Sequence, residues 1–132
     1  MTAPVVQLRQ LAGDYVIARL PAAALVPDVL TQLHPEVDLL SITRTPQELS
    51  IVCPVELTPA GAVIEGTWSA LYAGGPMPFG LTGVVTSLVA PLSAAGCPVF
   101  VVSTFDGDVL MVQSSDLGRA RDLLTAAGHL LV

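Results

Sequence analysis

Residues 99–112 read Val-Phe-Val-Val-Ser-Thr-Phe-Asp-Gly-Asp-Val-Leu-Met-Val. Two apolar, β-branched runs flank a short Asp-Gly-Asp turn, which is a strong signal for a β-hairpin. The turn places Asp106 and Asp108 next to a long uncharged region, because Gly66 to Phe105 contains no charged residue. Two carboxylates beside an uncharged helix start suggest that something cationic is held there.

The composition favours one compact domain, or two small domains that share a core, because 52% of the 132 residues are hydrophobic. The formal net charge is −6, and all five basic residues are arginines. This charge opposes binding to nucleic acid and to anionic membrane surfaces. The absence of lysine also excludes Schiff-base chemistry and the lysine of a phosphate-binding P-loop.

Cysteine and histidine are too sparse to build a metal site. Cys53 and Cys97 form no Cys-x-x-Cys pair, so we interpret both as small buried hydrophobic residues of a cytoplasmic protein. His34 and His129 each lack a second ligand at metal-binding spacing, and we expect them at the surface or at a helix end. The sequence also contains no Gly-x-Ser-x-Gly motif and no paired acid and base. We therefore predict no metal, no cofactor and no catalysis.

Within the uncharged region, residues 81–102 are apolar enough to be considered as a membrane span. Prolines and glycines divide the region into pieces too short to cross a bilayer of about 30 Å. No basic residue flanks it, and residues 1–16 lack the apolar core of a signal peptide. We therefore expect no membrane partner. The dividing residues are Pro76, Pro78, Gly80, Pro91, Gly96 and Pro98.

The second half of the chain predicts the order strand, helix, strand, strand, helix, strand. Apolar residues from Leu81 to Leu92 recur at helical spacing, and Pro91 predicts a kink or an early last turn near residues 87–92. Gly128 is placed to end the second helix. The order is the βαββαβ pattern of ferredoxin-like α+β folds, with an antiparallel sheet and two helices on one face. The expected elements are residues 67–73, 81–92, 97–104, 109–113, 116–127 and 130–132.

The first half of the sequence predicts mainly β-strands. Residues 5–11 and 14–20 form either a hairpin or one bent strand, and residues 39–43 and 49–53 form a second pair. Thr58-Pro59 has the form of a helix N-cap followed by proline at the first helical position.

Shifting the sequence by sixty positions aligns residues 41–52 with 101–112 and Glu48 with Asp108. This match favours an internal duplication, although any two hairpins of equal length can be aligned in this way.

Several motifs, spread in order over about a hundred residues, carry a family resemblance. They are Ser41–Thr45, Glu48–Pro54, Phe79 with Leu81–Gly83, Pro91–Leu92, and Ser103–Phe105 with Asp108. In this succession the chain resembles stand-alone bacterial ACT-domain proteins. It is also similar to the ACT domains of eukaryotic cytosolic arginine sensors and, more distantly, to aspartokinase regulatory domains.

The resemblance implies two ferredoxin-like ACT domains fused in tandem, an incomplete one at residues 1–65 and a complete one at 66–132. It further implies a regulatory protein, with an amino acid bound at an interface between ACT units and with no catalysis. By the same resemblance, Asp108 matches the acid that contacts the ligand in the arginine sensors, and Thr104 and Phe105 match its neighbours.

The chemistry of a free amino acid agrees with this resemblance. Its carboxylate needs clustered N–H donors, which the expected helix start at Leu81–Gly83 would provide. Its ammonium group needs a carboxylate, for which Asp108 is the candidate. Thr104 and Phe105 would add backbone groups and a ring wall. The full set of candidate ligand-binding residues is Phe79, Leu81, Thr82, Gly83, Val84, Ser103, Thr104, Phe105, Asp106 and Asp108.

A purely structural interpretation accounts for many of the same residues. Asp106-Gly107 is ordinary turn chemistry, and Gly83 could serve close helix packing alone. Phe79 is more typical of a core residue than of a ligand wall, and Arg44 and Glu48 are expected to pair across their own hairpin. With so few charges to protect its sheet edges, the chain could instead be a binding-silent interaction domain that forms a homodimer.

Overall fold

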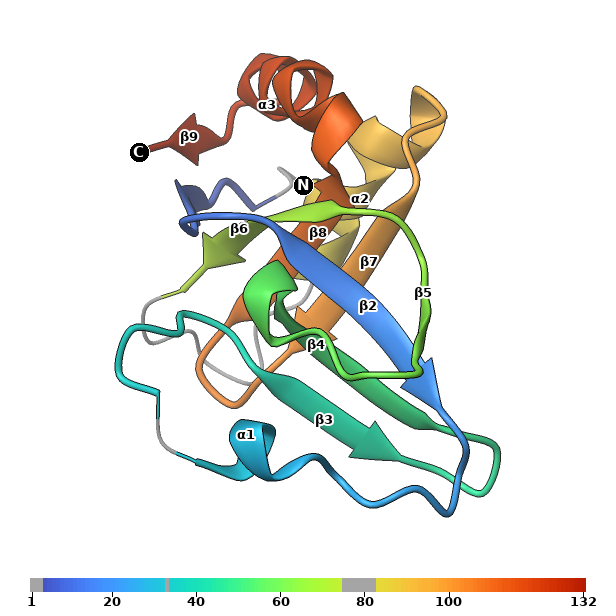
Figure 1. Cartoon of the computed structure of the whole chain (residues 1–132). Coiled ribbons are helices and arrows are strands. Elements are labelled where there is room, and N and C mark those ends of the chain that lie inside the picture. The colour runs from blue at the N-terminus through green and yellow to red at the C-terminus, as the bar shows by residue number, and fades with distance from the viewer. Residues whose placement is uncertain (1–3, 33, 75–82) are drawn as a thin grey trace. The chain divides into compact units, whose positions relative to one another are not determined.

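The computed structural model describes residues 4–32, 34–74 and 83–132 and has an α+β fold with a mixed sheet (Figure 1). The chain divides into two compact units. Residues 12–68 form one, which we call the inserted unit, and residues 1–11 together with 69–132 form the C-terminal unit. No helix in the described ranges is long and apolar enough to cross a membrane.

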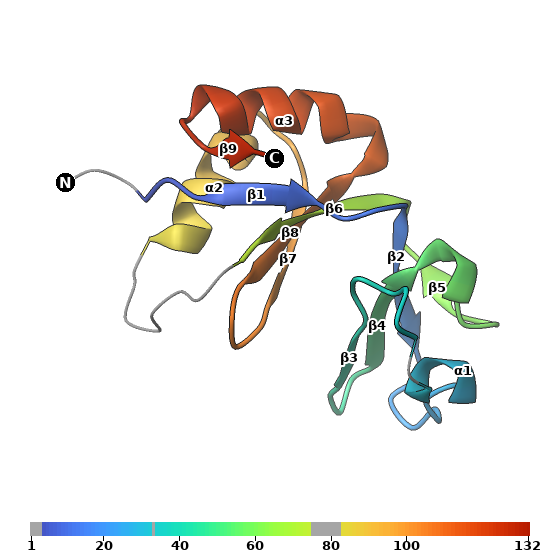
Figure 2. The same cartoon turned by 90° about the vertical axis from the view of Figure 1, so that its left-hand side faces the viewer.

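The C-terminal unit has the predicted order of elements. Helices α2 and α3 cover one face of its strands (Figure 2). Leucine, valine and alanine side chains from both layers form most of its core. Leu110 and Val112, which alternate along one strand, are fully buried in this core. The elements are β1 (Gln7–Gln10), β6 (Trp68–Ala73), α2 (Val84–Ala94), β7 (Val99–Ser103), β8 (Asp108–Gln113), the 3₁₀ helix η2 (Ser114–Asp116), α3 (Leu117–Ala126) and β9 (Leu130–Leu131).

The amino-terminal strand β1 belongs to this unit and not to a hairpin with the following strand. It pairs antiparallel with β6, with Leu8 opposite Ala73, and parallel with the two-residue strand β9. The expectation of a purely antiparallel sheet is therefore wrong at this edge. Strand β1 adds the buried side chain of Leu8 to the core beneath the helices. The two-residue strand β9 alone is too short to cover that part of the core.

Of the two expectations for Pro91, a kink or an early last turn, the early last turn is wrong, because α2 continues to Ala94. Proline has no N–H, so it leaves the carbonyl of Ser87, four residues earlier, without its helical donor. The Nε2 atom of His129 lies 2.9 Å from this carbonyl oxygen. Of the two placements expected for His129, the surface is wrong, because its side chain is only 3% exposed, and the helix end is right, because its backbone N–H, just after α3, donates to the carbonyl of Leu124.

The inserted unit is an antiparallel sheet over a small core. Strand β2 pairs with β4 on one side and with β5 on the other, and β3 pairs with β4. Alternate residues of β2 and β4, including Val16, Ala18, Leu49 and Ile51, pack together with Leu30. Its elements are β2 (Tyr15–Leu20), α1 (Asp28–Thr31), β3 (Ser41–Arg44), β4 (Leu49–Pro54), the 3₁₀ helix η1 (Val55–Leu57) and β5 (Val63–Ile64).

Two local expectations in this unit are wrong. Thr58 does not start a helix but ends η1, where its hydroxyl donates to the carbonyl of Val55 over 2.6 Å. Gly61, with a φ of 75°, lies in the left-handed region and prevents a helix from continuing there. Arg44 forms no ion pair with Glu48. Its guanidinium group instead donates to the carbonyl oxygens of Ala22 and Ala24.

The hairpins β3–β4 and β7–β8 share one turn design. In the first, the N–H of Thr45 donates to the carbonyl of Glu48 over 2.9 Å. In the second, the N–H of Thr104 donates to the carbonyl of Gly107 over 2.8 Å. Equivalent residues are therefore 59 positions apart, since the difference between 104 and 45 is 59. The expected shift of sixty is wrong by one residue, and Glu48 corresponds to Gly107, not to Asp108.

Candidate functional site

Asp108 is the first residue of β8 and lies opposite Ser103, the last residue of β7. The hydroxyl of Ser103 donates to the Oδ1 atom of Asp108 over 2.6 Å. Asp108 alternates along β8 with Leu110 and Val112, which face α2 and α3. Because every second residue of a strand shares a face, Asp108 starts on the helix-covered side of the sheet. Ser103 thus holds a partly exposed carboxylate at the end of this face.

Residues 104–107 form the turn and fix the position of Asp108. The Thr104 hydroxyl lies 3.0 Å from the carbonyl oxygen and 3.2 Å from the amide nitrogen of Gly107. A Cβ atom on Gly107 would come within 2.6 Å of the carbonyl oxygen of Ala73 in β6. The absence of a side chain at this position therefore lets the turn approach β6.

The other candidates in the turn point to different roles. Phe105 is 77% exposed, so its ring is not part of the core. Asp106 is also exposed. Gly107 therefore has a structural role in the turn. Of the two acids in the hairpin, Asp108 is the one with a side-chain hydrogen bond, to Ser103.

Helix α2 begins at Val84, and Gly83 is its N-cap with a left-handed φ of 82°. We expected Gly83 in the first turn of the helix, which is wrong, because a right-handed helix requires a negative φ. Glycine adopts this left-handed conformation without strain. Gly83 has no side chain with which to cap the helix start. The candidates Phe79, Leu81 and Thr82 lie outside the described residues.

The helix start and the hairpin contribute to one core. Val84 is 7% exposed and packs in the same cluster as Leu110 and Val101. Val101 lies two residues before Ser103, and Leu110 lies two residues after Asp108, on the same face of their strands. Val84 is therefore a core residue, and it links α2 to the two strands that carry Ser103 and Asp108.

The C-terminal unit matches the ACT domain family at residues 63–126, and a family of N-terminal domains matches residues 13–60. The crystal structure of protein Atu0741 from Agrobacterium tumefaciens is 45% identical, with a TM-score of 0.87, and the match covers 98% of this chain and 94% of that one. The chain is an ACT-domain protein.

Two further relatives of this ACT-domain protein extend the comparison. Human CASTOR3P is 32% identical over 90 residues, which cover 58% of this chain and 55% of that protein, so the chain spans about half of its length. The regulatory subunit of aspartate kinase from Thermus thermophilus has the same fold, with a TM-score of 0.63 at 11% identity, covering 95% of this chain and 99% of that one. No catalytic domain is among the matched families.

Metal binding has no support in the described part of this ACT-domain protein. No group of three or more histidine, cysteine, aspartate or glutamate side chains is placed there to hold an ion. Cys53 is fully buried, and burial raises the pKa of its thiol to about 11. The thiol therefore stays protonated near neutral pH, which does not favour a role as a nucleophile.

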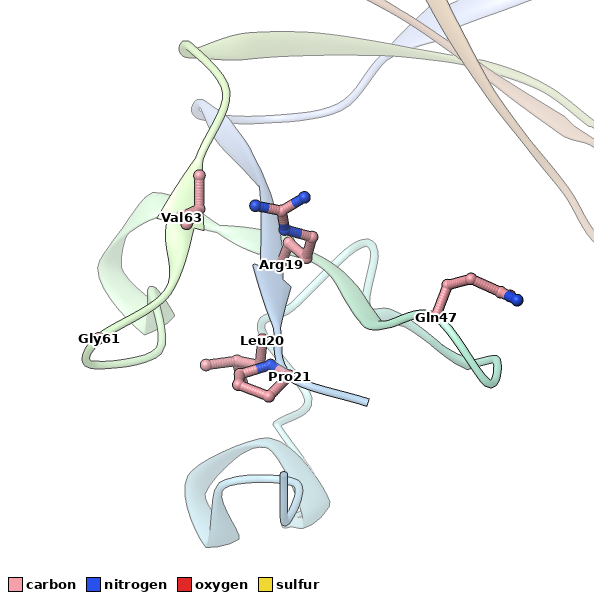
Figure 3. Close-up of a pocket in the computed structure, with 6 residues that line it drawn as sticks. All are labelled: Arg19, Leu20, Pro21, Gln47, Gly61 and Val63. Atoms are coloured by element: carbon pink, nitrogen blue, oxygen red, sulfur yellow. The ribbon is translucent and has the colours of Figure 1, made fainter. Parts of the chain in front are cut away.

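One feature of the ACT-domain protein was not predicted from its sequence. The inserted unit contains an open pocket of about 390 Å³, lined by residues from the end of β2, from β5 and from the β3–β4 turn (Figure 3). Arg19 is its charged residue. The only sequence signal was an arginine within the apolar run of residues 15–20, and nothing in the run indicated a concave surface. The lining residues are Arg19, Leu20, Pro21, Gln47, Gly61 and Val63.

Proposed function

We propose that this ACT-domain protein is a non-catalytic regulatory module of the cytoplasm that binds an amino acid or a similar small zwitterion. The binding site would combine Leu81–Gly83, which precede α2 in the sequence, and the first turn of α2 with the hairpin residues Ser103–Asp108. The observation that carries the proposal is the hydrogen bond from Ser103 to Asp108 at the end of the helix-covered face.

The Ser103 hydroxyl occupies one oxygen of the Asp108 carboxylate and orients the other. A carboxylate held in this way can accept a charge-assisted hydrogen bond from an ammonium group without first losing side-chain freedom. The ammonium group of a free amino acid is a donor of this kind. Asp108 is therefore assigned to the ammonium group, and Ser103 is a positioning residue.

The first amides of α2 would serve the ligand carboxylate. The N–H groups at the start of a helix have no partner within the helix, and the helix dipole favours an anion there. The N-cap residue, Gly83, has no side chain that could cap this end. A site with an acid at one end and helix amides at the other matches the two opposite charges of a zwitterion.

The comparisons favour this function over an enzymatic one. One structural relative is named as the regulatory subunit of an aspartate kinase in its ligand-free form. ACT domains typically bind amino acids, and the ACT family match spans the hairpin and the helix start. We therefore propose a regulatory role for this chain as well.

Thermal unfolding with each of the twenty amino acids tests the proposal. A ligand present at about a hundred times its dissociation constant should stabilise the fold by about 2.7 kcal/mol. Asp108→Asn should abolish this stabilisation, and Ser103→Ala should weaken it. Asp106→Asn is the matched control, because it removes an exposed acid two residues away. Equal stabilisation of the wild type and Asp108→Asn would reject the assigned role.

A binding-silent interaction domain is the second candidate, and the edge of the C-terminal unit favours it. Strand β7 pairs with β8 and with no other described strand, and its residues Val99–Ser103 carry no charge. An uncharged edge strand can pair with a second copy, which would give a homodimer. Light scattering after size exclusion tests this function. Val102→Lys should convert a dimer to a monomer, and a wild-type monomer that responds to no amino acid would reject both functions.

A further inference from the structure

Arg19 is unlike the other arginines of this protein. Arg9 lies over the ring of Tyr72, 5.8 Å from its centroid. Arg44 and Arg119 donate to backbone carbonyls, and Arg121 donates to the Oε1 atom of Gln10. Within the described residues, no hydrogen bond, ring contact or carboxylate within 4 Å engages the guanidinium group of Arg19. An arginine without an internal partner, in a chain of net charge −6, is available to an external anion.

The sheet arranges complementary groups on both sides of Arg19. Its neighbour on β4 is Ser50, and its neighbour on β5 is Val63. Residues directly opposite each other on neighbouring strands share one face of the sheet. Thr43 of β3 continues this row beyond Ser50. Arg19 therefore lies between Ser50 and Val63 on one face of the sheet.

The pocket around Arg19 has both polar and apolar walls and no acid. Pro21 and Val63 add apolar groups, and the side chain of Gln47, from the β3–β4 turn, points away from Arg19 (Figure 3). A volume of about 390 Å³ lies within the range of small-molecule sites. Because no lining residue is acidic, the pocket offers no carboxylate to the ammonium group of a zwitterion.

We propose that the pocket around Arg19 binds a small organic carboxylate that has a short aliphatic chain and no amino group. The planar guanidinium group of Arg19 would accommodate the carboxylate through two parallel N–H···O hydrogen bonds. The aliphatic chain would cover Val63, which lies opposite Arg19 on the same face of the sheet. This site lies in the inserted unit and does not depend on Asp108, so it is separate from the amino-acid site proposed above.

Isocaproate, isocaproamide and leucine are matched probes for this pocket. The three share one branched aliphatic chain, but the amide lacks the charge and leucine adds an ammonium group. A ligand of this size in an open pocket should have a dissociation constant on the order of 1 mM. In ¹⁵N-labelled full-length protein, isocaproate should produce saturable shifts of the amide signals of Arg19, Gly61 and Val63. Isocaproamide and leucine should shift the same signals at least tenfold less at equal concentration.

Substitutions at Arg19 test whether its guanidinium group holds the carboxylate. Arg19→Gln should remove the isocaproate response, and Arg19→Lys should weaken it because lysine lacks the planar fork. Arg121→Gln is the matched control, since it removes one exposed arginine from the other unit. Arg19 is exposed, so its substitution should leave the thermal midpoint unchanged. Asp108→Asn should keep the isocaproate response and lose only the stabilisation by an amino acid.

Three results would overturn the proposal. One is the absence of any shift with isocaproate, and another is an equal shift in wild type and Arg19→Gln. The third is an equal response to inorganic phosphate, which would mean that Arg19 attracts anions without recognising the aliphatic chain.

Discussion

The ring of His129 joins the carbonyl of Ser87 in α2 to the N–H of Val6, which directly precedes β1. Its Nε2 atom lies 2.9 Å from the Ser87 oxygen, and its Nδ1 atom lies 3.2 Å from the Val6 nitrogen. A backbone N–H can only donate, so Nδ1 is the acceptor and Nε2 carries the proton. His129 thus provides the donor that Pro91 cannot, and it connects the two ends of the chain to one helix.

Replacing His129 with alanine should destabilise the protein by about 2 to 4 kcal/mol, because two buried backbone groups lose their partners. Pro91→Ala restores an N–H that can reach the Ser87 carbonyl within the helix. In that background, the cost of His129→Ala should fall by about 1 kcal/mol. Urea unfolding of the four proteins measures this difference. Additive costs would show that His129 does not compensate for the proline.

The order of elements in the C-terminal unit could be predicted because each element has its own local signal. The hairpin has a turn flanked by β-branched runs, and α3 has an apolar stripe followed by Gly128. The role of His129 could not be predicted in this way, because its partners Ser87 and Val6 are 42 and 123 positions away. The same holds for β1, whose pairing with β6 depends on the burial of Leu8 and not on its neighbours in sequence.

The sequence alignment of the β3–β4 and β7–β8 hairpins was wrong by one residue. The sequence alignment matched the acid Glu48 with the acid Asp108. The hydrogen bonds of Thr45 and Thr104 show instead that Glu48 is equivalent to Gly107. A shift by one residue moves every side chain of a strand to the opposite face. The sequence identified Asp108 as a candidate but could not reveal its partner, Ser103, because strand register decides which residues meet.

Gly107→Ala should destabilise the protein by about 1 to 3 kcal/mol, because the new Cβ atom would lie 2.6 Å from a backbone oxygen that cannot move freely. Gly118→Ala is the matched control. Gly118 lies within α3, and nothing lies within 4 Å of an added Cβ there. That substitution should stabilise the protein by about 0.5 to 1 kcal/mol. Chemical denaturation distinguishes the two, and equal effects would argue against the close approach of the turn to β6.

Arg44→Ala should loosen the loop that follows β2, because the guanidinium group holds the carbonyls of Ala22 and Ala24. We expect faster amide hydrogen exchange in residues 22–26 and a loss of about 1 kcal/mol in stability. Glu48→Gln should leave both quantities unchanged, since Glu48 does not pair with Arg44. If Glu48→Gln reproduced the effect of Arg44→Ala, the two side chains would form the ion pair that the structure lacks.

Alkaline pH should destabilise the inserted unit through two buried groups. Burial raises the pKa of the Cys53 thiol from 9.0 to about 11. Burial, with the negative charges of Asp38 and Glu56, also raises the pKa of Tyr15. Both groups lose their proton more easily in the unfolded chain, so the unfolded state gains stability as the pH rises. The contribution of Cys53 is complete below pH 9 and declines toward pH 11.

Cys53→Ala separates the thiol from other alkaline effects. The substitution leaves a small cavity and should lower stability at pH 7 by about 1 kcal/mol. Between pH 9 and 11 the variant should lose less stability than the wild type, because it has no thiol to ionise in the unfolded state. Urea unfolding at several pH values measures both slopes. Parallel slopes would mean that the Cys53 thiol ionises equally well in the folded protein, which would contradict its burial in the core of the inserted unit.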